Sequence, residues 1–156
     1  GGASAGNDGW TGIGEVNLAG GIRAPSVEVT EERFPLFVVN HELRPGSAGD
    51  GQWRGGLGAV CEIIYEGEGE ASMNTAGDGV KVPPFGLFGG SPGLPHRYSL
   101  VSNGTERVLR TKETGVPVFP GDSIIALSSG GGGYGDPQDR DEESQAWDEK
   151  NGYATK

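Results

Sequence analysis

The imidazole and thiol groups of this sequence, which are common general bases, nucleophiles and metal ligands, come from two histidines and one cysteine. His41 shares a predicted strand face with Phe37, Val39 and Leu43, which favours a core or interface position over a catalytic base. His96 lies beside Arg97 in a proline-rich loop and is predicted to be exposed. Cys61 lies on an apolar strand face, where a buried thiol is inert. Because the three residues lack zinc-site spacing, we expect no catalytic and no metal-binding residue in this chain.

Two arginines, Arg44 and Arg54, flank a turn-rich loop with the acidic residues Glu42 and Asp50. An arginine presents a planar fork that binds a carboxylate or a phosphate through two hydrogen bonds. One interpretation is therefore an anion or interface site, and the other is a set of internal ion pairs that hold the loop. We favour the internal pairs.

Two glycine clusters, residues 54–58 and 129–135, raise the possibility of a phosphate loop. Such a loop normally follows a strand, opens a helix and continues into Gly-Lys-Ser or Gly-Lys-Thr, and neither cluster does so. Tight turns and close backbone packing are favoured, with a weak anion site left open where Asp136 and Pro137 begin a helix. The candidate binding or interface residues are Glu42, Arg44, Arg54, Gly55, Gly56, Gly58, Gly131, Gly132 and Tyr134.

The segments that must position these residues read mostly as short strands. Pro35 indicates that its strand begins at a sheet edge, and Asn103-Gly104 is a strong hairpin signal. A final helix is capped by Asp136 or Asp141 and ends near residues 151–152. The predicted strands cover residues 26–30, 34–43, 57–66, 70–74 and 123–127, with a hairpin over 98–109.

The composition is unusual for a folded chain of 156 residues, because 31 are glycine and 10 are proline. Glycine loses the most backbone entropy on folding, and burial against partner chains is one way to offset that cost. We predict a mainly β fold, a small glycine-rich barrel or sandwich-like domain with extended, polyproline-like segments and a short C-terminal helix. The expected divisions are an extended segment over 1–25, a β domain over 26–135 and an acidic helix and tail over 136–156.

The net charge of −10 argues against nucleic-acid and anionic-membrane partners. Residues 136–149 carry seven acids and one arginine, a run that favours a solvated helix face over a docking tail. A single cysteine excludes an intrachain disulfide and fits a reducing compartment. With no signal peptide or apolar span visible, we expect a cytoplasmic location.

Five blocks, in order, resemble the hydantoinase B/5-oxoprolinase family. Any one block alone is a weak match, but their order and spacing over roughly residues 25–155 are specific. The blocks are FPL at 34–36 with HELRPGSAGDG at 41–51, RGGLG at 54–58, PPFGLFGGSPG at 83–93, PGD at 120–122 with SGGGGYGDP at 129–137 and RD at 140–141, and NGY at 151–153.

The resemblance implies a chain that matches only the last portion of much longer family members. Their catalytic and metal-binding residues lie mostly upstream and have no counterpart here. The resemblance therefore implies a small, non-catalytic subunit, closest to the small subunit of acetophenone carboxylase, in a complex that joins a ketone and bicarbonate to form a 3-oxo acid. ATP and a divalent metal are then expected on large hydantoinase A-like and hydantoinase B-like partners.

Other functions remain open at this point. One is a subunit of an ATP-dependent hydantoinase or 5-oxoprolinase, which these residues barely distinguish from a carboxylase subunit. Another is an independent β module that binds a ligand through Trp53, Phe85 and Phe88. An autonomous enzyme is the least favoured, because no plausible acid–base pair is visible.

Overall fold

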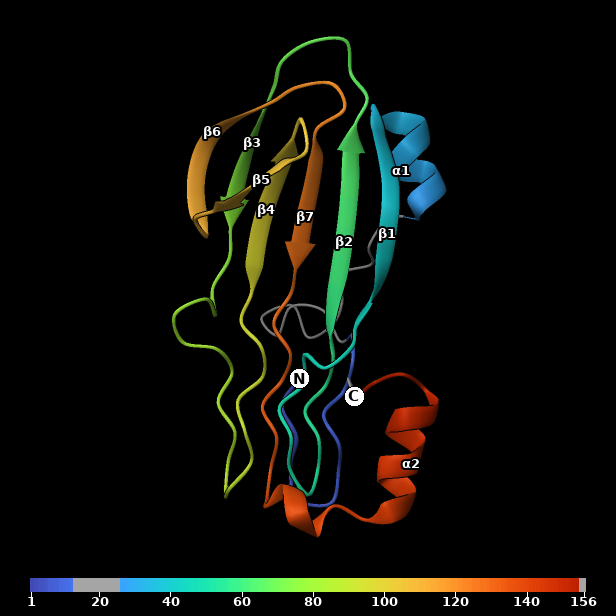
Figure 1. Ribbon diagram of the computed structural model, residues 1–156, viewed down its shortest axis with the longest axis vertical. Coiled ribbons are helices and arrows are strands. Elements are labelled where there is room, and N and C mark those ends of the chain that lie inside the picture. The colour runs from blue at the N-terminus through green and yellow to red at the C-terminus, as the bar shows by residue number, and fades with distance from the viewer. Residues whose placement is uncertain (13–25, 155–156) are drawn as a thin grey trace.

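The computed structural model describes residues 1–12 and 26–154. Figure 1 shows two sheets in its upper half and helix α2 beside extended segments in its lower half. The elements in chain order are α1 (Val27–Arg33), β1 (Leu36–Arg44), β2 (Gly58–Tyr65), β3 (Ala71–Ala76), β4 (Arg97–Ser102), β5 (Thr105–Leu109), β6 (Lys112–Val118), β7 (Ser123–Leu127), η2 (Pro137–Asp139) and α2 (Glu142–Lys150).

The strands form two antiparallel sheets, a large one in the order β1-β2-β7-β4-β5 and a small one of β3 and β6. Between them lies a core of Leu100, Leu109, Val116 and Val118, against which half-buried side chains such as Ile124 pack. Each fully buried aliphatic side chain contributes roughly 1.5–3 kcal/mol. The prediction of a mainly β fold with a short C-terminal helix is confirmed, and within the described residues the sheets do not close into a barrel.

Local signals placed several elements correctly. Asn103 and Gly104 have φ of 48° and 75°, as the tight turn between β4 and β5 requires. Strand β1 follows Pro35 and lies at the sheet edge, as predicted. Helix α2 is capped by Asp141, whose side chain accepts a hydrogen bond from the Ser144 amide.

One prediction about secondary structure is wrong, and one strand was missed. Residues 26–30 do not form a strand, because the Ser26 hydroxyl caps helix α1 by accepting a hydrogen bond from the Val29 amide at 3.3 Å. Strand β6 was not predicted, because Gly115, with φ of 66°, and Pro117 interrupt its pattern. In the part of the chain that the structure describes, β6 pairs with β3 on one side and with no strand on the other, so the missing amide of Pro117 is tolerated there.

The lower half of the molecule is a glycine bundle, formed by four extended segments over residues 1–11, 46–57, 83–94 and 128–136. At its centre, Gly130 to Gly133 each face a neighbouring backbone so closely that an added Cβ would lie well under 3.0 Å from it. The carbonyls faced are Ser47 at Gly130, Gly1 at Gly131, Phe85 at Gly132 and Asp50 at Gly133. Glycines three apart therefore face the same segment, which is the period of a polyproline II helix.

Backbone hydrogen bonds join the segments of the glycine bundle. The Gly49 amide donates to the Gly131 carbonyl and the Gly131 amide to the Gly56 carbonyl, both at 2.8 Å, and the Gly133 amide donates to the Ser91 carbonyl at 3.0 Å. The glycine-rich segments thus find within this chain the partners that buried backbone groups need. Of the helices described, none has the length and apolar character required to cross a membrane.

Candidate functional site

The structure brings most of the predicted site residues together in the glycine bundle. Gly55 faces the Gly131 carbonyl, and Gly56 accepts the Gly131 amide. Trp53 and Tyr134 exchange two backbone hydrogen bonds at 2.9 and 3.0 Å, and their ring centroids lie 5.7 Å apart. The close-packing interpretation of both glycine clusters is therefore confirmed.

Of the remaining predicted residues, Gly132 lies at the centre of the bundle, Gly58 lies where the bundle meets β2, and Glu42 lies outside it. The Gly58 amide, at the start of β2, donates to the Ser47 hydroxyl at 2.8 Å. Gly132 accepts a hydrogen bond from the Ala3 amide. Glu42 is exposed on β1 opposite Val60. It takes no part in the contacts of the bundle that involve the other candidates.

Arg44 holds backbone rather than an acidic side chain. Its Nη1 donates to the carbonyls of Pro95 at 2.9 Å and Ser128 at 3.1 Å. Burial and the nearby charge of Arg97 lower the pKa of Arg44. The predicted internal pairing with Glu42 or Asp50 is therefore wrong for Arg44, which ties the end of β1 to the loops beside β4 and β7.

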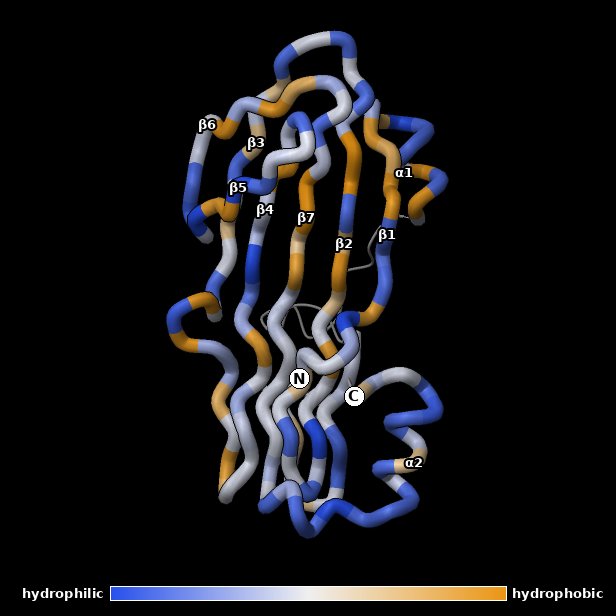
Figure 2. Tube along the Cα trace, in the orientation of Figure 1, coloured by the Kyte–Doolittle hydropathy of each residue, from blue (hydrophilic) through white to orange (hydrophobic). Residues whose placement is uncertain are grey.

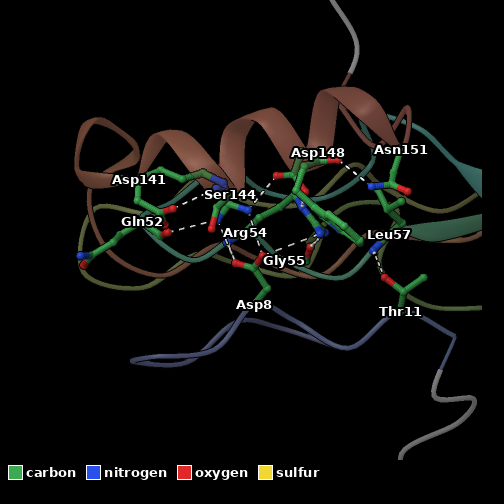
Figure 3. A network of polar contacts seen from close by, with 12 residues as sticks. Asp8, Thr11, Gln52, Arg54, Gly55, Leu57, Asp141, Ser144, Asp148 and Asn151 are labelled. Atoms are coloured by element: carbon green, nitrogen blue, oxygen red, sulfur yellow. Dashed lines mark hydrogen bonds and ion pairs between the residues drawn. The ribbon is translucent and has the colours of Figure 1, made fainter.

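Arg54 does form internal ion pairs, but with residues far from its own loop. Its Nε donates to Asp148 Oδ1 at 3.1 Å, and its Nη2 lies 3.8 Å from Asp8 Oδ2. A second arginine, Arg140, donates to both oxygens of Asp8 at 2.9 Å and to Asp148 Oδ2 at 2.7 Å. Figure 3 shows Arg54 between α2, which carries Asp148, and the segment that carries Asp8. We call these four residues the charge network.

Three members of the charge network are largely withdrawn from water, while the Asp8 side chain remains 35% exposed. The exposed fractions of the side chains are 12% for Arg54, 10% for Arg140 and 6% for Asp148. Two positive and two negative charges balance, and charge-assisted hydrogen bonds of this kind are stronger than neutral ones. Removing one member of such a buried set leaves an uncompensated charge, which is strongly destabilising.

Ionisation in the charge network is reinforced by its geometry. Burial alone would raise the pKa of Asp8, but hydrogen bonds from Arg140 and the Arg54 amide, with the charges of both arginines, lower it. The hydrogen bond to Asp8 and the two acidic charges raise the pKa of Arg140 further above its usual range, against the effect of burial. Arg54 also donates to the Gly55 carbonyl at 2.6 Å and lies over the Tyr153 ring, 5.3 Å from its centroid.

Sequence reasoning missed three members of the charge network. Arg140 carried a signal, because it is the one base among the seven acids of residues 136–149. Asp148 lies in the predicted solvated face but is buried, whereas Glu142 and Glu143 are exposed as expected. Asp8 gave no signal, since it lies in a segment without any periodic pattern.

A cleft of about 370 Å³ separates α2 from the glycine bundle. Its walls include Asp50, Arg54, Arg140, Asp148 and Tyr153. Both arginines are already paired, so the cleft offers no free cation from the charge network. Within residues 1–12 and 26–154, no group of three or more His, Cys, Asp or Glu side chains is placed to hold a metal ion.

The histidines and the cysteine lie apart from the charge network. His41 is exposed on β1, so the prediction of a core position is wrong, and the alternative prediction of an interface position stays a prediction. His96 is half-buried rather than exposed, because its ring packs edge-on against Tyr98 at 4.2 Å. Burial, with the charge of Arg44, lowers the pKa of His96. Burial raises the pKa of the Cys61 thiol, which fits a weak nucleophile.

Comparison with known proteins identifies relatives that are much longer than this chain. A putative D-/L-hydantoinase B-type subunit of Pseudomonas sp. (strain NS671) is 31% identical over a 158-residue alignment, which covers 99% of this chain and 26% of the relative. The acetophenone carboxylase delta subunit of Aromatoleum aromaticum is 31% identical over 163 residues, 85% of this chain and 24% of the relative. The chain thus spans about a quarter of these relatives.

Solved structures share the fold. An ATP-dependent caprolactamase from Pseudomonas jessenii matches with a TM-score of 0.83 and 26% identity over 99% of this chain and 27% of that one. A nucleotide-free acetone carboxylase matches with a TM-score of 0.82 and 22% identity, over 99% and 24% respectively. The family model of hydantoinase B/oxoprolinase matches residues 1–137. The chain therefore belongs to the hydantoinase B/oxoprolinase family, as its five sequence blocks indicated.

Proposed function

We propose that this chain is a structural, non-catalytic part of an ATP-dependent, cytoplasmic enzyme complex. The observation that supports this role is the charge network, in which the converging charged side chains neutralise one another and fasten three distant segments. Catalysis needs a nucleophile or base that is free to meet a substrate. The titratable groups that converge here are instead used to hold α2 and the N-terminal segment in place.

We assign ATP and a divalent metal to hydantoinase A-like and hydantoinase B-like partner polypeptides. A phosphate loop needs backbone amides that point at the anion. Three amides of this glycine segment already donate hydrogen bonds to carbonyls within the chain. They are Gly130 to Leu94, Gly131 to Gly56 and Gly133 to Ser91. This use of the amides supports our placing phosphate binding on the partner polypeptides.

The reaction that we propose for the complex is the carboxylation of a ketone with bicarbonate to a 3-oxo acid. Support comes from the 31% sequence identity between this chain and the acetophenone carboxylase delta subunit. A second candidate is the ATP-dependent opening of a cyclic amide. It is supported by the hydantoinase B-type subunit and the beta subunit of a caprolactamase, whose sequence alignments each cover 99% of this chain.

The test is native purification through this chain, identification of the co-eluting polypeptides by mass spectrometry, and assay of the purified complex with ATP. Ketone-dependent incorporation of labelled bicarbonate would support the carboxylase, and release of an open-chain amino acid would support the amide hydrolase. Recovery of the chain without any larger family member would refute the structural role.

A matched pair of variants tests whether the chain is catalytic. Arg54→Ala should reduce the yield of assembled complex while the turnover per assembled complex stays close to that of the wild type. Lys112→Ala serves as control, because Lys112 is exposed and makes a long ion pair to exposed Asp78 at 3.6 Å. Loss of turnover in fully assembled Arg54→Ala complex would place this residue in the catalytic machinery.

A further inference from the structure

A group of large apolar side chains projects into solvent from the loop between β3 and β4. Phe85, Leu87 and Phe88 expose 72%, 45% and 75% of their surface. In Figure 2 this loop runs down to the lower end of the glycine bundle, where its tube turns orange. We call the three residues the aromatic tip. Exposed aromatic clusters of this kind mark interaction sites rather than ordinary surface.

The backbone beneath the aromatic tip is fixed. The Leu87 amide donates to the Gly133 carbonyl at 2.9 Å, and the Leu87 carbonyl accepts the amides of Gly90 and Gly135 at 3.0 Å. Gly132 packs directly against the Phe85 carbonyl. The backbone of the tip is therefore tied to the central segment of the bundle, and its side chains are exposed to solvent.

Phe88 also has an unfavourable backbone conformation. Its φ is +52°, in the left-handed region that bulky residues rarely adopt and that glycine or asparagine adopts more readily. Its ring lies against that of Tyr134 in a tilted arrangement, with centroids 5.0 Å apart, while most of the side chain faces solvent. Strain of this kind concentrates at functional positions. A phenylalanine at this strained position is explained if the function of the chain requires the exposed ring.

We infer that the aromatic tip is the anchor by which this chain docks into an apolar pocket on the remainder of a hydantoinase B-type polypeptide. The inference rests on the proposed function. The hydantoinase B-type subunit and the caprolactamase chain match nearly all of this chain yet are about four times as long. Each therefore has a large additional region beyond the part that corresponds to this chain. A rigid aromatic side chain loses little entropy on binding, which is why such residues act as anchors at the centre of interfaces.

The decisive variant is Phe88→Asn, because asparagine tolerates the left-handed backbone while it removes the ring. Phe119→Asn is the matched control, since Phe119 is an exposed phenylalanine in the turn between β6 and β7. Affinity for the large polypeptides that co-purify with the wild-type chain is measured by titration, and folding of each variant by its Tm. We expect Phe88→Asn to raise Kd at least about tenfold with an unchanged or higher Tm, and Phe119→Asn to leave Kd unchanged.

The outcomes separate this inference from the proposed function. Failure of the wild-type chain to bind any large polypeptide refutes both. Normal binding by Phe88→Asn refutes the docking role of the tip and leaves the structural role standing. Self-association of the wild-type chain that Phe88→Asn abolishes would assign the tip to a second copy and overturn the inference.

Hydroxyl-radical footprinting gives a check that needs no variant. Oxidation of Phe85 and Phe88 should fall when the complex assembles, and unchanged oxidation would contradict docking.

Discussion

Replacing Asp148 of helix α2 by alanine removes the carboxylate that accepts hydrogen bonds from both Arg54 and Arg140. The side chain is buried, so water cannot replace it without opening the structure. Loss of one partner from a buried pair costs about 3–5 kcal/mol. Because Arg140 keeps its two hydrogen bonds to Asp8, we expect the low end, about 3 kcal/mol. For a chain of this size, that loss corresponds to a fall in Tm of roughly 6–12 °C.

Urea unfolding of the isolated chain, followed by circular dichroism, measures the free energy of unfolding directly. Hydrogen exchange of the α2 amides is measured in parallel, because a helix of nine residues can open locally before the sheets unfold. The control is Glu142→Gln, an exposed acid on the same helix, for which we expect no measurable change. A double-mutant cycle with Arg140→Ala then isolates the pair, with an expected coupling of about 0.5–3 kcal/mol.

The refuting result is equally concrete. If Asp148→Ala changes neither the free energy of unfolding nor α2 exchange more than Glu142→Gln does, then the charge network does not hold the helix. The packing of α2 would have to rest on its other contacts, such as those of Tyr153 with Arg54 and with the backbone of residue 148. The structural role assigned to Arg54 would fall with it.

Three further outcomes are expected. Gly132→Ala should prevent stable folding, because the Cβ of the alanine would collide with the Phe85 carbonyl. Gly69→Ala should be tolerated, because no heavy atom lies within 4 Å of an added Cβ there. Soluble yield and Tm of the two variants measure the difference. Ser26→Ala should cost about 1 kcal/mol in urea unfolding through loss of the α1 cap. Asp8 has a lowered pKa, so its stabilisation is complete above the ordinary carboxyl pKa of about 3.9 and is lost as pH falls through the folded value. Asp8→Asn should therefore differ most from the wild type at neutral pH and least at low pH, in Tm measured against pH.

The sequence predicted those elements whose signals are local. The turn at Asn103 and Gly104 needs only two residues with positive φ, and α2 needs only a capping aspartate and a closing glycine. Strand β2 showed its alternation in the side chains themselves, although in the structure residues 59–65 are all half-buried. These features could be read from a window of a few residues, without knowledge of the rest of the chain.

The elements that were missed depend on distant contacts or on competing local signals. Residues 26–30 alternate over too short a span to separate a strand from the first turn of a helix, and the Ser26 cap decides between them. Strand β6 becomes recognisable only when β3 pairs with it, since Gly115 and Pro117 hide its pattern. The charge network joins Asp8 to Arg140 across 132 residues, a pairing that no local window contains.

The two halves of the molecule are stabilised by different forces, and this makes the two main proposals separable. The upper half has an apolar core between its sheets, whereas the glycine bundle is joined by backbone hydrogen bonds and fastened to α2 by the charge network. The aromatic tip is tied to Gly133 and Gly135, not to α2. Asp148→Ala should therefore weaken the fold around α2 while the tip still docks, and Phe88→Asn should weaken docking while α2 stays in place.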